Sequence, residues 1–136
     1  MFLGKNNMQQ ERIKAQRTVT GARSYYSGLA AEKNAKEQQQ KAGWVILLER
    51  AKTRRGEIDL VAYKGAVLCF FEVKKRKTTR SALECLLPAQ QKRLYRAAEC
   101  LLAAYPMWHF EEMRFDLIGF DENNNCVWVK DILRQF

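Results

Sequence analysis

Two acidic residues and a lysine stand in neighbouring apolar stretches of the sequence, at a spacing that could act on phosphates. Asp59 lies in the stretch 56–63, and Glu72 and Lys74 lie in the stretch 66–74. Residues alternate sides along a β-strand, so Glu72 and Lys74 should point to one face. Mg²⁺ and Mn²⁺ prefer carboxylate oxygens, and an ammonium group can stabilise a phosphate transition state. The pattern predicts a metal-dependent phosphodiester-cleaving site with Asp59 and Glu72 as metal ligands.

The turn between the two stretches decides whether these acids meet. A two-residue turn at 64–65, where glycine accepts a positive φ, would pair Tyr63 with Ala66. Counting outward from that pair places Asp59 diagonally beside Glu72 on the same face, about 7–8 Å away. A slip by one residue would turn Asp59 to the other face. The predicted site therefore depends on the register of this hairpin.

The same acids could instead line an exposed sheet face and form surface salt bridges. In the predicted register Glu57 lies opposite Glu72, and Val61, Leu68 and Phe70 share their face. Apolar residues of this size indicate that part of the face is covered, and acids beside a covered surface need a compensating partner. We therefore favour a site over a solvated face.

A helix predicted before the hairpin carries a further acid. Glu32 follows Leu29 by three residues and precedes Ala35 by three, which places it on the small and apolar side of that helix. An inward Glu32 could bind a second metal or its water. A solvated glutamate explains the position equally well.

A second predicted helix offers amide side chains near its start. Gln90 and Gln91 precede Leu94 by four and three residues, close to Pro88, which suits a first helical turn. Amide groups and a helix N-terminus both suit phosphate, so we expect nucleic-acid contacts here. Polar first-turn residues without a ligand are the equal alternative.

The overall charge favours an anionic partner. The chain has 24 Lys and Arg against 15 Asp and Glu, which gives a net charge of +9. Nucleic acid comes first and an acidic membrane second as the partner of such a surface. Basic runs flank the hairpin, and a solvated surface or a localisation signal would also explain them. We expect five of these residues to follow a phosphate backbone: Arg54, Arg55, Lys75, Arg76 and Lys77.

The elements that must hold these residues follow from periodicity and from turn residues. We expect a mixed sheet with a helix on each face, an α/β fold. The predicted elements are a helix at 24–42 ended by Gly43, a strand at 44–48, the hairpin, a helix from Pro88 to Pro106, and strands at 113–119 and 126–129.

Length and composition set the remaining limits. With 136 residues the chain suits one domain, which we place at 21–136 after a flexible basic arm at 1–20. No apolar run approaches the ~20 residues needed to span a bilayer. The four widely spaced cysteines suit reduced core thiols. We expect a protein of the cytoplasm without a membrane contact.

Several motifs together resemble a known family. Asp59 with the segment 72–74, and Glu32 on the preceding helix, resemble the PD-(D/E)XK nuclease core of the Holliday-junction-resolvase-like branch. More closely, the chain resembles the small bacterial YraN family, also called UPF0102. The segments that carry this resemblance are Gly28 with Glu32, 43–44, 56–62, 71–74, Pro88, Leu94 and 114–116.

The resemblance implies a restriction-endonuclease-like core in the order α-β-β-β-α-β. It implies Asp59 and Glu72 as metal ligands, Lys74 as the catalytic lysine and Glu32 as the helix acid. Two positions depart from the family pattern. Gln90 stands where a basic residue is expected. Ala51 stands where an Asn often follows the arginine matched by Arg50.

These observations together predict a Mg²⁺- or Mn²⁺-dependent endonuclease, a hydrolase acting on branched or otherwise structured DNA in bacteria. One alternative is a nucleic-acid-binding module of DNA repair or recombination that keeps the fold without turnover. Another is an adaptor whose basic surface docks an acidic protein. A homodimer would suit a symmetric DNA junction.

Overall fold

Two long apolar runs pair at the centre of the fold, in a computed structural model that describes residues 27–133. They form the antiparallel strands β2 (Gly56–Lys64) and β3 (Val67–Lys75). β-branched and aromatic side chains such as Val61 and Phe70 suit a pleated surface and are fully buried here. The predicted hairpin is therefore confirmed.

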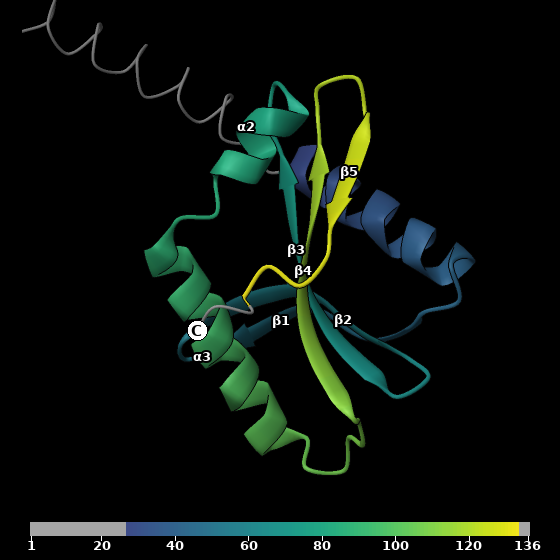
Figure 1. Cartoon of the computed structure of the whole chain (residues 1–136), viewed down its shortest axis with the longest axis vertical. Helices are drawn as coiled ribbons and strands as arrows, with labels where there is room; N and C mark the ends of the chain where they lie inside the picture. The colour runs from purple at the N-terminus through teal and green to yellow at the C-terminus, as the bar shows by residue number, and fades with distance from the viewer. Residues whose placement is uncertain (1–26, 134–136) are drawn as a thin grey trace, which may run out of the picture. The chain divides into compact units, whose positions relative to one another are not determined.

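Three further strands complete a mixed sheet in the order β1-β2-β3-β4-β5. These are β1 (Val45–Thr53), β4 (Glu112–Phe120) and β5 (Cys126–Val129). Only β3 and β4 run parallel to each other. A parallel pair needs a long crossover, and the segment between these two strands contains two helices. Figure 1 shows the strands side by side through the middle of the fold.

The longer of these helices, α3 (Pro88–Ala104), has the bounds that its sequence predicts. Pro88 occupies the start of the helix, where a missing N–H costs nothing, and Pro106 follows its C-cap, Tyr105. The shorter helix, α2 (Thr79–Glu84), falls in a stretch that we had not assigned to any element. Its start is capped by the Thr78 side chain, which accepts a hydrogen bond from the Ser81 backbone N–H.

A helix at 27–41 precedes the sheet. It is followed by Gly43, whose φ of 94° favours glycine. The chain divides after Ala30 into two compact units, and the second, Ala31–Phe136, contains the sheet, α2 and α3. The predicted arm at 1–20 lies outside the described residues, and the domain boundary stays a prediction. None of the helices within residues 27–133 is long and apolar enough to cross a bilayer.

The sheet separates two apolar clusters within the second unit. One contains Ala31 and Ala35 of the first helix with strand residues such as Phe71, and the other contains α3 residues such as Leu94. The two helices therefore cover opposite faces, as Figure 1 shows. The predicted α/β class with helices on both sides of a mixed sheet is confirmed. Ile58 corrects a detail, because it packs on the α3 side rather than with Leu60.

A buried carboxylate joins the last two strands. Asp116 on β4 is 0% exposed and accepts a bidentate pair of hydrogen bonds from the Arg114 guanidinium. It also accepts hydrogen bonds from the indole N–H of Trp128 at 2.8 Å and the backbone N–H of Asp131 at 2.9 Å. Four donors therefore compensate one buried charge, which is the condition for burying a carboxylate at tolerable cost.

Replacing this carboxylate should destabilise the whole fold. We expect Asp116→Ala to lower the free energy of unfolding by about 3–5 kcal/mol, because it leaves an arginine and two N–H groups without their acceptor. Urea denaturation followed by circular dichroism measures this loss. Asp121→Ala is the control, since Asp121 bonds only to neighbouring turn residues. Equal losses for the two variants would contradict the account of Asp116.

Candidate active site

The register of the β2–β3 hairpin differs from the predicted one by two residues. Lys64 pairs with Val67, so the turn is formed by residues 65–66 rather than 64–65. A shift of two leaves side chains on their predicted faces, and Ile58 is the exception noted above. Continuing the count past the last pair, Leu60 with Phe71, sets Asp59 level with Glu72 instead of Phe70. The prediction that Glu57 lies opposite Glu72 is wrong, because the same count sets it level with Lys74.

Where the β2–β3 backbone pairing ends, the Asp59 side chain accepts a hydrogen bond in place of a backbone carbonyl. Its Oδ2 accepts a hydrogen bond of 2.7 Å from the backbone N–H of Val73. No β2–β3 pair beyond Leu60 and Phe71 remains in the ladder. The carboxylate of one strand thus satisfies a donor of the next strand and is held at a fixed place between them.

The environment of Asp59 disfavours its ionised form. Burial and, next to it, the negative charge of Glu72 raise the pKa of Asp59 to about 8, although the Val73 hydrogen bond acts in the opposite direction. Glu32 also raises this pKa and Lys74 lowers it. Asp59 and Glu72 line the same cavity, so their carboxylates can act on each other in this way. A carboxylate in this situation becomes easier to ionise when a cation binds beside it.

Glu72 and Lys74 form the pair that strand alternation predicts. The Lys74 Nζ lies 2.9 Å from Glu72 Oε1, and the two side chains are 22% and 11% exposed. A partly covered ion pair is weakly screened by solvent, so each partner is held in place for the other. The predicted acid and lysine therefore share one face and one contact.

Glu32 approaches the acids from the first helix. Arg50 Nε lies 3.8 Å from Glu32 Oε2 and 3.8 Å from Glu57 Oε1, so one guanidinium stands between the two carboxylates. That separation is too long for a hydrogen bond, and Glu32 Oε2 is a buried oxygen without a hydrogen-bond donor in the structure. Burial raises the pKa of Glu32, Arg50 lowers it, and Glu57 and Glu72 raise it.

Arg50 itself has an unusual backbone. Its φ of 49° lies in the left-handed region, which L-residues other than glycine, asparagine and aspartate visit rarely. The β1–β2 register pairs Glu49 with Leu60 and Ala51 with Ile58, on either side of Arg50. The irregularity thus falls at the strand position beside the acids. Sequence periodicity gives no sign of it.

The acids border a cavity of about 270 Å³ between the sheet and α3. Asp59 and Lys74 line its sheet side, and Gln90 and Arg93 line its helix side. The remaining lining residues are Glu57, Glu72, Leu86 and Leu94. The structure thus brings together Asp59, Glu72, Lys74 and Gln90 in one cavity. We refer to this cavity as the acidic cleft.

Of the two predicted glutamines of α3, only Gln90 lines the cleft, and an arginine that was not predicted lines it as well. The Gln91 amide donates a hydrogen bond to the Leu86 carbonyl at 3.1 Å, and Gln91 does not line the cleft. A nucleic-acid contact of Gln91 stays a prediction. Arg93 does line the cleft, and sequence reasoning missed it, although it follows Gln90 by three residues and so shares its helix face. Gln90 Oε1 is buried and lacks a donor in the structure.

The two basic runs contact different elements and do not form one groove at the base of the hairpin. Arg54 and Arg55 lie on the β1–β2 turn and line a second cavity against α3. Lys75 Nζ donates to Asn124 in the β4–β5 turn, and the Lys77 carbonyl accepts the Glu122 backbone N–H. Arg76 is exposed beside them. Convergence of the two runs on one place is therefore not observed.

The donor set suits a hard divalent cation. The acids near Asp59 are Glu32, Glu57 and Glu72. Two cations form ion pairs with them: Arg50 with Glu32 and Glu57, and Lys74 with Glu72. Within residues 27–133 no group of three or more Asp, Glu, His or Cys side chains is arranged to hold a metal. Mg²⁺ commonly needs only one or two carboxylates and keeps water in its other positions. Asp59 and Glu72 can supply that pair.

The raised pKa of Asp59 leads to a prediction about stability without metal. A carboxyl whose pKa is raised in the folded state stabilises the fold below its unfolded pKa, 3.8, and this contribution is lost as the pH rises toward 8. Asp59→Asn mimics the neutral form, so in EDTA at pH 7.5 it should raise the free energy of unfolding by on the order of 2–4 kcal/mol. The gain should shrink toward pH 4.

Denaturant titrations at several pH values measure this trend. The control is Asp121→Asn, because turn hydrogen bonds lower the pKa of that exposed carboxyl and predict the opposite direction of pH dependence. A constant difference between Asp59→Asn and the parent chain from pH 4 to pH 8 would argue against a strained acid at this place.

Comparison with known proteins assigns the chain to a family. The model of the "Uncharacterised protein family UPF0102" matches residues 31–120, which include the acids, the lysine and the whole of α3 and β4. A UPF0102 protein of Rhodopseudomonas palustris is 42% identical over 95 residues, or 70% of this chain and 73% of its own length. One of Parvibaculum lavamentivorans is 43% identical over 100 residues, covering 74% and 75% of the two chains. One of Granulibacter bethesdensis is 36% identical over 118 residues, covering 87% and 75%. The chain therefore belongs to the UPF0102 family.

Proposed function

We propose that this protein is a magnesium-dependent endonuclease that hydrolyses phosphodiester bonds in DNA at the acidic cleft. The observation that carries the proposal is the meeting of Asp59, Glu72 and Lys74 in one cavity open to solvent and bordered by Arg93. Carboxylates with an ammonium group beside them are the groups that metal-assisted phosphate hydrolysis requires. The similarity of this arrangement to the PD-(D/E)XK core supports the same reaction.

Each side chain has a role that follows from its place. Asp59 and Glu72 would hold the Mg²⁺, which would supply a Lewis acid and a water of lowered pKa. The Lys74 ammonium, held 2.9 Å from Glu72, balances the charge of that carboxylate and can donate to a phosphate oxygen as negative charge develops. Glu32 Oε2, which has no hydrogen-bond donor in the structure, can accept a hydrogen bond from a water.

The opposite wall of the cleft suits the phosphate itself. Arg93 presents a guanidinium that can hold two phosphate oxygens at once. Gln90, which stands where relatives are expected to carry a basic residue, offers an amide donor instead. Acids on the sheet and donors on α3 therefore face each other across a space that a sugar-phosphate backbone can enter. This polarity favours DNA over an acidic protein as the substrate.

The setting of the reaction belongs to the same proposal. The four cysteines, Cys69, Cys85, Cys100 and Cys126, are all free thiols, which suits the reducing bacterial cytoplasm. Branched DNA would suit a homodimer with two clefts. A binding module of DNA repair without turnover is the second candidate. It is favoured by the absence, within residues 27–133, of a cluster of three or more metal-ligating side chains.

Substitution of the acids should separate cleavage from binding. We expect Asp59→Asn and Glu72→Gln each to reduce Mg²⁺-dependent nicking of a four-way DNA junction at least 100-fold, since each removes one charged ligand. DNA affinity should stay within a few-fold of the parent. Glu122→Gln, a change at an exposed acid in the β4–β5 turn, is the matched control.

The substrate panel should include linear, flapped and nicked DNA with Mg²⁺ or Mn²⁺. Cleavage that survives both acid substitutions would place the reaction elsewhere. A parent protein that binds DNA but cuts none of these substrates would instead support the binding module.

Metal binding can be tested without any activity. Mg²⁺ should raise the melting temperature of the parent, because a ligand that binds only the folded state stabilises it by roughly 1–3 kcal/mol at 10 to 100 times its Kd. The shift should be lost in the Asp59→Asn/Glu72→Gln double variant and kept in Glu122→Gln. Equal Mg²⁺ shifts in the parent and the double variant, measured by calorimetry, would exclude the cleft as the metal site.

A further inference from the structure

A second cavity, of about 400 Å³, lies beside the acidic cleft and has the opposite charge. It is lined by Arg54 and Arg55 of the β1–β2 turn and by Arg96 of α3. The other lining residues are Glu99, Cys100 and Ala103. We propose that this arginine pocket binds a backbone phosphate of the same DNA strand, a few nucleotides from the bond held in the acidic cleft. The inference rests on the proposed function and extends it to a named anchoring site.

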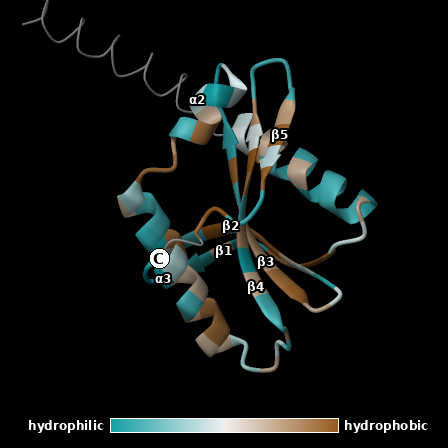
Figure 2. Cartoon of the chain, viewed as in Figure 1, coloured by the Kyte–Doolittle hydropathy of each residue, from teal (hydrophilic) through white to brown (hydrophobic). Residues whose placement is uncertain are grey.

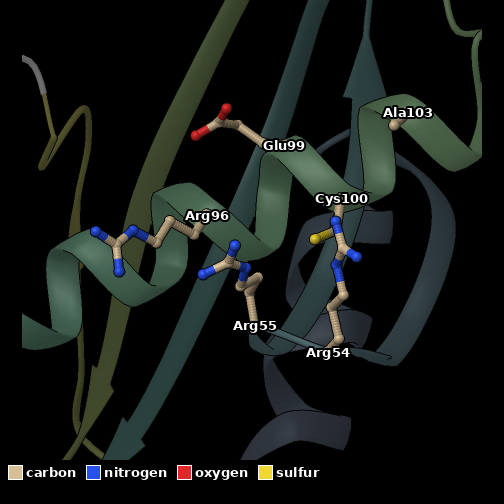
Figure 3. Close-up of a pocket in the computed structure, with 6 residues that line it drawn as sticks. All are labelled: Arg54, Arg55, Arg96, Glu99, Cys100 and Ala103. Atoms are coloured by element: carbon tan, nitrogen blue, oxygen red, sulfur yellow. The ribbon is translucent and has the colours of Figure 1, made fainter.

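The side chains of the pocket are arranged to meet an anion. Figure 3 shows Arg54 reaching toward Cys100, the Arg55 guanidinium near the base of the Arg96 side chain, and the Arg96 guanidinium extending further along α3. Glu99 projects away from these guanidinium groups, and its carboxylate makes no ion pair with them. The three arginines have no carboxylate partner within residues 27–133. Like charges gathered in a hollow repel one another, and a bound anion relieves that repulsion.

Arginine is well suited to phosphate in this place. Its planar guanidinium can donate two parallel hydrogen bonds to phosphate oxygens, and several guanidinium groups can share one phosphate. The pocket volume of about 400 Å³ leaves room for a phosphate with the sugars on each side. The β1–β2 side of the pocket is partly fixed, since the Thr53 hydroxyl accepts hydrogen bonds from the backbone N–H groups of Arg55 and Gly56.

The two cavities follow one another along the same two elements. On α3, Arg93 borders the acidic cleft and Arg96 borders the arginine pocket. On the β1–β2 hairpin, Glu57 borders the cleft and Arg55 borders the pocket. Helix residues advance 1.5 Å each, so Gln90 and Cys100 are roughly 15 Å apart along α3. The phosphates of one DNA strand lie about 3.4 Å apart along the helix axis, so this span matches a few nucleotides.

Gly56 lies between Arg55 of the arginine pocket and Glu57 of the acidic cleft, and it packs closely against α3. Its φ is 153°, and a Cβ added there would lie 3.0 Å from the Arg93 Cγ. The absence of a side chain thus lets the β1–β2 turn approach α3 at the border between the cavities. Figure 2 shows that the first turns of α3 are hydrophilic, whereas its last turns are hydrophobic. The hydrophilic turns contain Gln90, Arg93 and Arg96, the helix side of this path.

The continuity of the path favours DNA over an acidic peptide as the occupant. A peptide carboxylate could meet the arginines, but an acidic peptide would have no group that uses the metal-binding acids of the neighbouring cleft. A nucleic acid strand needs both cavities, because it binds by its phosphates at the arginines and presents one phosphate to the metal-binding acids. The alternating charge of the two cavities fits that single ligand.

The test measures binding in EDTA, where no cleavage occurs. We expect the double variant Arg55→Gln/Arg96→Gln to weaken binding of a fluorescent DNA junction roughly tenfold and to reduce the slope of log Kd against log salt by about 1 or more. The matched control is Lys33→Gln/Lys41→Gln, which removes the same charge from exposed positions of the first helix. The control should change the affinity less than about twofold. Thermal unfolding verifies that both variants are folded.

Cys100 provides a second measurement at the pocket itself. Bound DNA should slow alkylation of Cys100 at least fivefold, as followed by peptide mass spectrometry. Cys126 is the internal control, since it lies exposed on β5 and hydrogen-bonds to Gln38 of the first helix. Its alkylation rate should not change.

The outcomes separate this inference from the proposed function. If the parent cuts DNA, yet the arginine variant binds like the control and Cys100 stays reactive, the pocket is not a DNA site and the cleft remains the active site. If acidic peptide protects Cys100 and DNA does not, the occupant is a protein. If the parent binds no DNA at all, both proposals are overturned. Protection of Cys100 with a reduced salt slope supports the inference even where cleavage is absent.

Discussion

The hydrogen bond from the Val73 backbone N–H to the Asp59 carboxylate is the interaction on which the candidate site depends. In an uninterrupted hairpin that N–H would face a carbonyl of the neighbouring strand. Here the β2–β3 ladder ends at Leu60 and Phe71, and a side chain replaces the backbone acceptor. The replacement fixes Asp59 between the strands and leaves Glu72 and Lys74 on the face toward α3. Without it, Asp59 would not be held beside Glu72 and Lys74.

This arrangement stores electrostatic strain that the rest of the fold must offset. Asp59 is buried among other carboxylates, and both burial and Glu72 raise its pKa. Arg50 and Lys74 compensate only part of the negative charge. Elsewhere the protein buries a carboxylate with full compensation, as at Asp116 with its four donors. Asp59 instead accepts one hydrogen bond from a backbone N–H and lies near the charges of Glu32 and Glu72, which is the setting in which perturbed acids of functional sites are found.

The sequence predicts most of the architecture, because periodicity and turn residues act locally. The bounds of α3 follow from Pro88, from the spacing of Leu94 and Leu101, and from Pro106. The hairpin register, by contrast, differs by two residues, since both Lys64–Gly65 and Gly65–Ala66 can form a tight turn. The acids still lie on the same face, because a register shift by an even number of residues does not change the face of a side chain. Ile58 changed sides where Arg50 adopts a positive φ, and no pattern in the sequence signals that irregularity.

Some side chains of the cleft could be predicted from local sequence, whereas others depend on how distant elements pack together. Glu72 and Lys74 are neighbours on one strand, so their contact was predictable from alternation alone. Arg93 and Gln91 were not, because only the docking of α3 decides which helix residues face the cleft. The basic runs were expected to converge, but their distances from the site are set by the β1–β2 turn and by the β4–β5 turn, which lie far apart in sequence. Charge counts alone cannot reveal such placement.

The most direct test of the central claim is anomalous diffraction from crystals of the parent protein soaked in Mn²⁺. The account predicts an anomalous peak within coordination distance of both the Asp59 and the Glu72 carboxylates, with the Lys74 ammonium still beside Glu72. A peak bound by other residues, or none at saturating Mn²⁺ with the cleft open to solvent, would contradict the claim that these strands form a divalent metal site.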